Sequence, residues 1–138
     1  MQELYRSAYQ RIEYDANYSL LKRVLTVTAD KQSWPEHQLE WQEYASLVKR
    51  YQPENIFVDA RQFDFLLISD MQDWINRNVI AVFNDIRLKK WAVAVPHEFL
   101  QQVGIEQTID SNPGNVFKTR YFETETEAMD WLMNGHLK

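Results

Sequence analysis

The chain has 138 residues, of which 45% are hydrophobic and 25% charged, and this composition excludes a disordered or collagen-like chain. A formal net charge of −5 argues against nucleic acid as the main partner, because binding a phosphate backbone needs an excess of basic residues. The absence of cysteine excludes a disulfide framework, a thiolate zinc site and a cysteine nucleophile.

The first half of the chain predicts a hairpin, a helix and a short buried strand. Two extended segments, about 7–14 and 20–28, flank turn-forming residues and predict an antiparallel hairpin. Residues 33–36 (Ser-Trp-Pro-Glu) have the spacing of a capping box, which predicts a helix from there to about Tyr51. The apolar run 56–58 is typical of a central parallel strand.

The second half predicts two further strands and three helices. In chain order these are a long helix that opens with a capping box at 69–72 (Ser-Asp-Met-Gln), a strand at 91–95, a short helix at 99–103, a strand at 116–122 and a terminal helix that opens with a capping box at 124–127 (Thr-Glu-Thr-Glu). A strong turn cluster at 110–115 precedes the last strand.

These elements predict an α/β fold of order ββαβαβαβα. We expect a single mixed sheet of four to five strands, an N-terminal antiparallel hairpin plus parallel strands, flanked by about four helices. The length and the lack of a linker predict one domain, 1–138. No apolar run approaches the roughly 20 residues that span a bilayer, so we expect a cytoplasmic protein without membrane insertion.

The connection between the 56–58 strand and the second helix carries the candidate binding residues. It is more apolar than a solvated loop, so Phe63, Phe65 and Leu67 must pack on something and, with Trp74, line an apolar pocket or form a subunit interface. Asp59 and Arg61 follow the strand at its carboxyl end, where open α/β sheets place binding sites. The alternative for these two is a turn cap and a surface ion pair.

The element order, the strand ending in Val58-Asp59 and the helix starting at Ser69 resemble the STAS superfamily of anti-sigma-factor antagonists. The closing segment, 122–132, is similar to the end of the small bacterial STAS/SEC14-like proteins. The resemblance implies a mixed sheet flanked by helices and no catalytic machinery. It also implies a function in binding a protein or a small ligand. Because the apolar loop lies beside Asp59 and Arg61, we expect a protein partner, a second copy of the chain or a small apolar, lipid-like ligand to bind through the loop and the start of the second helix.

Ser69 occupies the place of the serine that phosphorylatable members of that superfamily carry in an Asp-Ser-Ser-Gly turn. Its surroundings here, Leu67-Ile68-Ser69-Asp70, lack the preceding Asp, the paired Ser and the following Gly. Two readings of Ser69 therefore stay open: a regulatory phosphosite of an anti-sigma-antagonist-type switch, or a helix N-cap without regulatory function.

An enzymatic alternative is a small hydrolase that uses Asp59, Asp64 or His97 as a general base. The three histidines lie in different segments without a metal-binding spacing, and three glycines are too few for a dinucleotide or phosphate loop. We therefore expect no catalytic residue, no metal and no cofactor, and favour a binding module over an enzyme.

Overall fold

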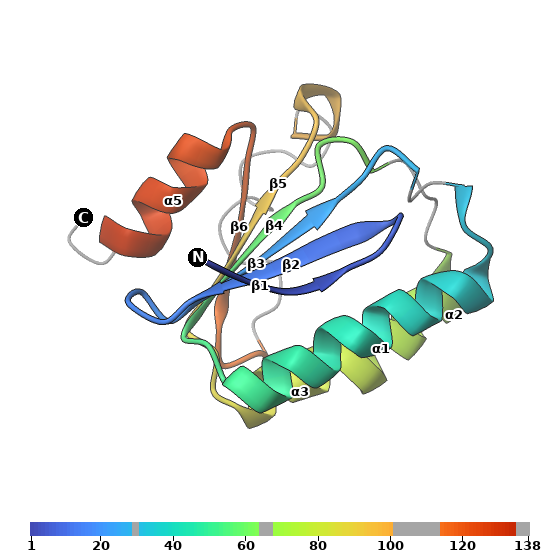
Figure 1. The fold of residues 1–138 in the computed structure, drawn as a ribbon, viewed down its shortest axis with the longest axis horizontal. Helices are drawn as coiled ribbons and strands as arrows, with labels where there is room; N and C mark the ends of the chain where they lie inside the picture. The colour runs from blue at the N-terminus through green and yellow to red at the C-terminus, as the bar shows by residue number, and fades with distance from the viewer. Residues whose placement is uncertain (29–30, 64–67, 101–113, 135–138) are drawn as a thin grey trace.

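The computed structural model describes residues 1–28, 31–63, 68–100 and 114–134. Within them one mixed sheet contains six strands in the order in which they occur in the chain (Figure 1). The first three are antiparallel: β1 (Gln2–Arg6), β2 (Gln10–Asp15) and β3 (Leu20–Leu25). The next three continue the sheet parallel to β3: β4 (Asn55–Asp59), β5 (Lys90–Ala94) and β6 (Lys118–Phe122).

The predicted α/β class with a single mixed sheet is confirmed, but the strand number of four to five is wrong. The additional strand is β1, whose two apolar residues, Leu4 and Tyr5, are adjacent rather than alternating. Its register with β2 shifts between Glu3 and Tyr5, so the period of two on which strand prediction depends is interrupted. An edge strand of this kind leaves a weak signal in sequence.

Two long helices lie side by side on one face of the sheet (Figure 1). The first is α1 (Trp34–Tyr51). The second runs without a break through α2 (Ser69–Ile75), the π-helical turn η2 (Asn76–Ile80) and α3 (Ala81–Asp85). Both connect neighbouring parallel strands in the same direction across the sheet, and right-handed crossovers then place them on the same face.

The opposite face is covered by α5 (Glu125–Asn134), which contacts β4, β5 and β6. Residues 97–100 are also helical, whereas the rest of the predicted 99–103 helix and most of the 110–115 turn cluster lie outside the described residues. None of the helices in the described ranges has both the length and the apolar character that crossing a bilayer requires.

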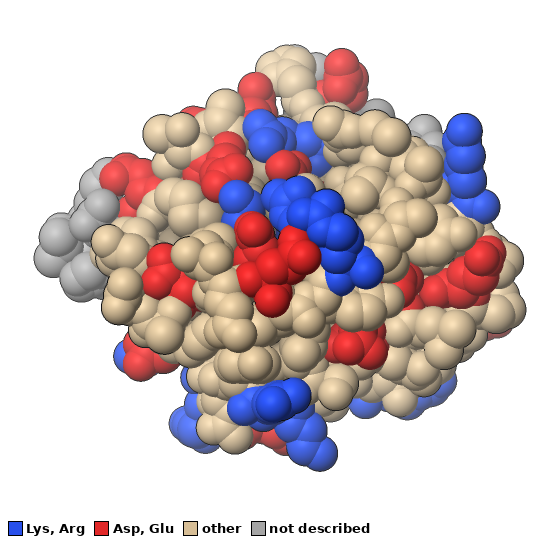
Figure 2. Space-filling model, in the orientation of Figure 1, with Lys and Arg blue, Asp and Glu red and all other residues tan. Residues whose placement is uncertain are grey.

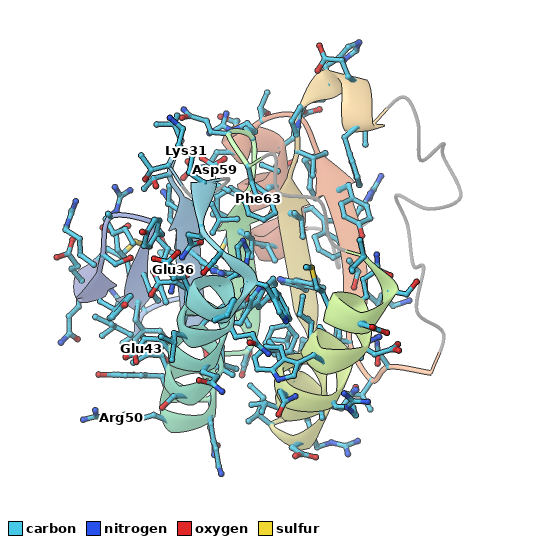
Figure 3. All side chains as sticks on the ribbon, turned by 90° about the vertical axis from the view of Figure 1, so that its right-hand side faces the viewer. Lys31, Glu36, Glu43, Arg50, Asp59 and Phe63 are labelled. Carbon is cyan, nitrogen blue, oxygen red and sulfur yellow. The ribbon has the colours of Figure 1, made fainter. Side chains whose placement is uncertain are left out.

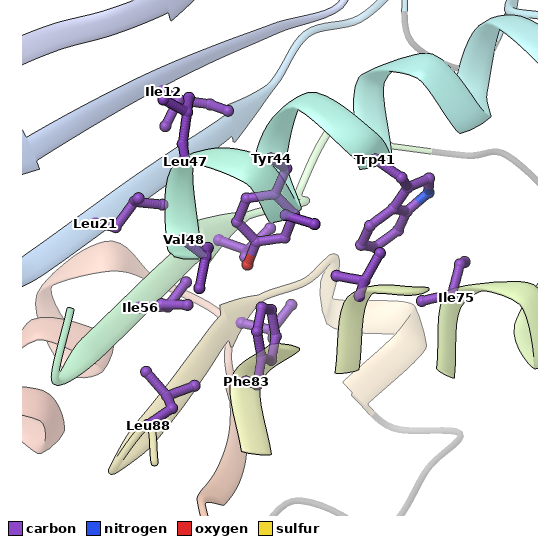
Figure 4. Packing of buried hydrophobic residues seen from close by; sticks show 14 of the residues in the cluster. Ile12, Leu21, Trp41, Tyr44, Leu47, Val48, Ile56, Ile75, Phe83 and Leu88 are labelled. Atoms are coloured by element: carbon purple, nitrogen blue, oxygen red, sulfur yellow. The ribbon is translucent and has the colours of Figure 1, made fainter. Parts of the chain in front are cut away.

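The central strands are buried on both faces, as is usual for parallel strands between two helical layers. In β4, Ile56 and Val58 contribute to the core below α1 and α3, whereas Phe57 contributes to the core below α5. Figure 4 shows Trp41 and Tyr44 pointing from α1 into the first of these cores. The inner surface of α1 is therefore strongly aromatic.

Two of the three predicted capping interactions are present. Ser33 is the N-cap of α1, its hydroxyl accepting from the Glu36 amide while the Glu36 carboxylate accepts from the Ser33 amide. The Thr124 hydroxyl likewise accepts from the Glu127 amide at 3.2 Å. The capping box at 69–72 is wrong: Ile68 is the N-cap of α2 and provides no side-chain hydrogen bond. The helix begins so early that Ser69 already lies in its first turn.

Replacing Ser33 with alanine is expected to lower the free energy of unfolding by about 1 kcal/mol, because the Glu36 amide loses its acceptor. The measurement is urea unfolding followed by circular dichroism. Ser46→Ala, an exposed change within the same helix, is the control and should leave stability equal or slightly higher. Equal stabilities for the two variants would show that the capping box contributes nothing.

Candidate functional site

Asp59 and Arg61 form an ion pair with each other. The Arg61 Nε donates to Asp59 Oδ1 at 2.9 Å and its Nη2 donates to Oδ2 at 2.7 Å. Burial acts to raise the pKa of the Asp59 carboxyl, but these hydrogen bonds outweigh it and hold the pKa below its ordinary value. The geometry therefore matches the surface-pair alternative that the sequence left open. Each charged group is the ion-pair partner of the other.

The remaining sequence candidates separate in space. Figure 3 shows Phe63 near the same end of the sheet as Asp59, and its ring lies 5.2 Å from the ring of His37. Trp74 packs edge-on against Trp34, with 5.6 Å between the ring centres. Phe65 and Leu67 lie outside the described residues. Phe63 lines the cavity described next, whereas Trp74 is not among the described lining residues of that cavity.

Ser69 is exposed and forms no cap, so the reading of Ser69 as a helix N-cap is wrong. The phosphosite hypothesis for Ser69 stays a prediction. Among the hydrolase candidates, His97 pairs with Glu123 at 2.8 Å, and Asp64 lies outside the described residues. Within the described ranges no group of three or more His, Asp or Glu side chains could hold a metal ion.

A cavity of about 580 Å³ lies between the sheet and the helices α1 and α2. Its floor is a row of residues that the parallel register aligns across four neighbouring strands. Arg23 of β3 pairs with Val58 of β4, Val58 with Val93 of β5, and Val93 with Tyr121 of β6. All four line the cavity, which extends beyond the carboxyl ends of the strands to Ala60.

The upper walls of the cavity come from segments far apart in the chain. Trp41 extends from α1, Gln72 from the start of α2, and Phe99 from the helical residues 97–100. Phe63 closes the side next to β4. Most of the described lining side chains are aliphatic or aromatic, so the cavity favours an apolar ligand over a strongly hydrated one.

A buried polar network supports the end of the cavity formed by β3. The Gln10 side chain accepts from Arg23 Nε at 2.6 Å and donates to the Glu40 main-chain oxygen at 2.9 Å. The Glu40 carboxylate accepts in turn from the hydroxyls of Tyr5, at 2.7 Å, and Ser7. The network thereby joins β1, β2 and β3 to α1 and holds the Arg23 side chain in one orientation.

The Arg23 guanidinium is stacked on two aromatic rings of α1. Its Cζ lies 4.2 Å from the ring centre of Trp41 and 4.4 Å from that of Tyr44, both within cation–π range. Only 1% of the residue is exposed. Burial lowers the pKa of Arg23 to about 10, which still leaves the group protonated at neutral pH.

Sequence reasoning did not single out Gln10, Arg23 or Glu40. A signal for Arg23 is nonetheless present, because it stands between Leu21 and Leu25 on the inward-facing positions of a strand. A charged residue at such a position is either paired in the core or placed there for binding. Sequence reasoning instead placed the candidate binding site in the apolar loop after the 56–58 strand, because that loop is unusually rich in hydrophobic residues.

The outer surface offers no comparable feature on the face shown in Figure 2, where Lys and Arg side chains lie beside Asp and Glu side chains instead of forming a basic area.

The chain matches no protein-family model, no curated protein and no solved structure. The resemblance to STAS/SEC14-like proteins therefore stays a prediction, and the class that fold and cavity define is an α/β domain with an apolar, arginine-containing cavity.

Proposed function

We propose that this protein is a non-enzymatic binding module of the cytoplasm that holds a small, largely apolar ligand in the cavity above Arg23, Val58 and Val93. The observation that carries the proposal is the cavity, since its volume of about 580 Å³ falls in the roughly 300–1,000 Å³ range of small-molecule sites. Its place at the carboxyl ends of parallel strands is where open α/β sheets bind ligands. The resemblance to STAS/SEC14-like proteins predicts the same kind of function.

The other functions predicted from the sequence receive less support. A hydrolase needs a base whose pKa lies near the working pH, whereas Asp59 is held below its ordinary pKa by Arg61. A protein partner or a second copy of the chain would bind through an exposed apolar surface, but Phe63 faces the cavity. Phe63, the one loop candidate among the described residues, thus supports ligand binding better than partner binding.

The test is a titration with N-phenyl-1-naphthylamine, a neutral apolar probe whose fluorescence rises in apolar surroundings. The wild-type protein is expected to bind it saturably. Ala60→Trp, which places a large ring in the cavity, is expected to weaken binding at least tenfold. Leu39→Trp adds the same ring on the outer surface of α1, where Leu39 is 65% exposed, and should bind the probe as the wild type does.

Equal probe binding by folded Ala60→Trp and wild type would overturn the proposal, as would a wild-type protein that does not bind the probe. Native mass spectrometry of protein purified from cells adds an independent measurement. A co-purified small mass that is absent from Ala60→Trp supports the proposal. A dimer whose mass contains only protein, in the absence of probe binding, would support the second-copy hypothesis instead.

A further inference from the structure

The Arg23 guanidinium has fewer partners than a buried cation needs. Its Nε donates to Gln10, but no described residue accepts a hydrogen bond from its two Nη groups or forms an ion pair with it. The Glu40 carboxylate accepts from the hydroxyls of Tyr5 and Ser7; its charge acts on Arg23 from a distance, but it accepts no hydrogen bond from the guanidinium. Burial raises the pKa of Tyr44, so its hydroxyl is neutral and supplies no counter-charge.

A buried guanidinium whose N–H groups lack acceptors is unfavourable, and the cation–π contacts with Trp41 and Tyr44, together with the distant charge of Glu40, offset only part of this. The Gln10 hydrogen bond orients the guanidinium but brings no charge. Arg23 nevertheless lines the cavity, and it is the one charged side chain among the described lining residues. The Nη groups therefore favour an oxygen acceptor, best an anionic one, that enters the cavity.

The charge of the site selects among anions. Because the Glu40 carboxylate already acts on Arg23, a monoanion adds less excess negative charge than a phosphate monoester, which carries about −1.5 to −2 at neutral pH. The neighbouring His37 does not add a second cation, because burial and the charge of Arg23 lower its pKa to about 4. A carboxylate also matches the planar fork of a guanidinium with two parallel hydrogen bonds.

We propose that the cavity binds an apolar monocarboxylate, whose carboxylate pairs with the Arg23 guanidinium while its hydrocarbon part lies along Val58, Val93 and Phe99. This rests on the proposed function and adds the chemical class of the ligand. Ligands of this class are free fatty acids and other organic acids with a single carboxylate and an apolar body.

The experiment displaces bound N-phenyl-1-naphthylamine with three molecules that share one chain and differ in head group: dodecanoate, methyl dodecanoate and dodecyl phosphate. On the wild-type protein, dodecanoate is expected to displace the probe at a concentration at least tenfold lower than the methyl ester. It should also act at a lower concentration than dodecyl phosphate. This comparison needs no variant, so it decides the proposal even where a substitution of Arg23 prevents folding.

Variants then locate the anion site. In Arg23→Met, the ratio of the concentrations at which methyl dodecanoate and dodecanoate displace the probe is expected to fall below threefold. Arg50→Met is the matched control, because Arg50 also stacks on an aromatic ring, that of Tyr51, but is exposed on α1. It should keep the full ratio. Loss of the ratio in Arg61→Met with retention in Arg23→Met would overturn the assignment in favour of the residue predicted from the sequence.

The possible outcomes distinguish failure of the carboxylate site from failure of the proposed function on which it rests. Equal displacement by acid and ester from a wild-type protein that binds the probe overturns the carboxylate site and leaves the apolar cavity standing. Stronger displacement by dodecyl phosphate overturns the choice of a monocarboxylate. Failure of the wild-type protein to bind the probe at all removes the proposed function itself.

Discussion

Replacing Phe83 with alanine is expected to lower the free energy of unfolding by about 3–5 kcal/mol, the largest effect that we expect of a single substitution. Phe83 of α3 is completely buried. Its ring lies edge-on to those of Tyr44, Trp91 and Phe117, at 5.8, 5.3 and 5.7 Å between ring centres. Large rings on three sides cannot close the space that a phenyl group leaves, so most of the free-energy cost of the empty cavity remains.

The measurement is urea unfolding, with the midpoint and the slope reported separately so that a change in stability is distinguished from a change in cooperativity. Phe99→Ala is the control, because Phe99 is 40% exposed and its ring lies 5.8 Å from that of Tyr121, at the rim of the fold's core. It is expected to cost less than about 1.5 kcal/mol. Similar losses for the two variants would contradict the assignment of Phe83 to the centre of the core.

The stability of the protein is expected to fall by about 2 kcal/mol between pH 7.5 and pH 5 because of His37. Burial, together with the charge of Arg23, lowers the pKa of His37 to about 4, whereas an unfolded histidine titrates near 6.5. Above about pH 6.5 both states are neutral and stability is full. Between pH 6.5 and pH 4, His37 binds a proton in the unfolded state but not in the folded state, so stability decreases as the pH falls.

Unfolding in urea at pH 7.5, 6.5, 5.5 and 5.0 measures this dependence, in a range where most carboxylates stay ionised. His37→Phe, which keeps a ring among Trp34, Trp41 and Phe63, should remove most of the slope. His97→Gln changes an exposed histidine and should keep the slope. A slope in His37→Phe as steep as that of the wild type would show that another group is responsible.

Local sequence patterns predicted most of the fold, because they depend on neighbouring residues alone. The capping box at 33–36 marks the start of α1, and the apolar run 56–58 lies within β4. The same reasoning failed where a local pattern had a competitor. Ser69 has a good capping sequence, but Ile68 takes the N-cap position, and β1 is held by pairing with β2 despite its weak alternation.

The candidate site was predictable only in part. The loop after β4 was expected to pack on something, and Phe63 does line the cavity. Asp59 and Arg61 were expected at the carboxyl end of the strand, where they lie, but their charges satisfy each other. Sequence alone cannot distinguish a charged pair available to a ligand from a pair that is already closed, because the difference is one of side-chain geometry.

Composition and periodicity were sufficient to establish an α/β chain with a mixed sheet and amphipathic helices, since helix and strand periods and caps are properties of short segments. The cavity depends on contacts between distant segments. The parallel register sets Arg23 beside Val58 and, through Val93, in line with Tyr121, and α1 covers the row with Trp41. Whether a charged side chain is solvated or buried depends on what the whole fold places around it, and the fold places Arg23 in the core at the wall of the cavity.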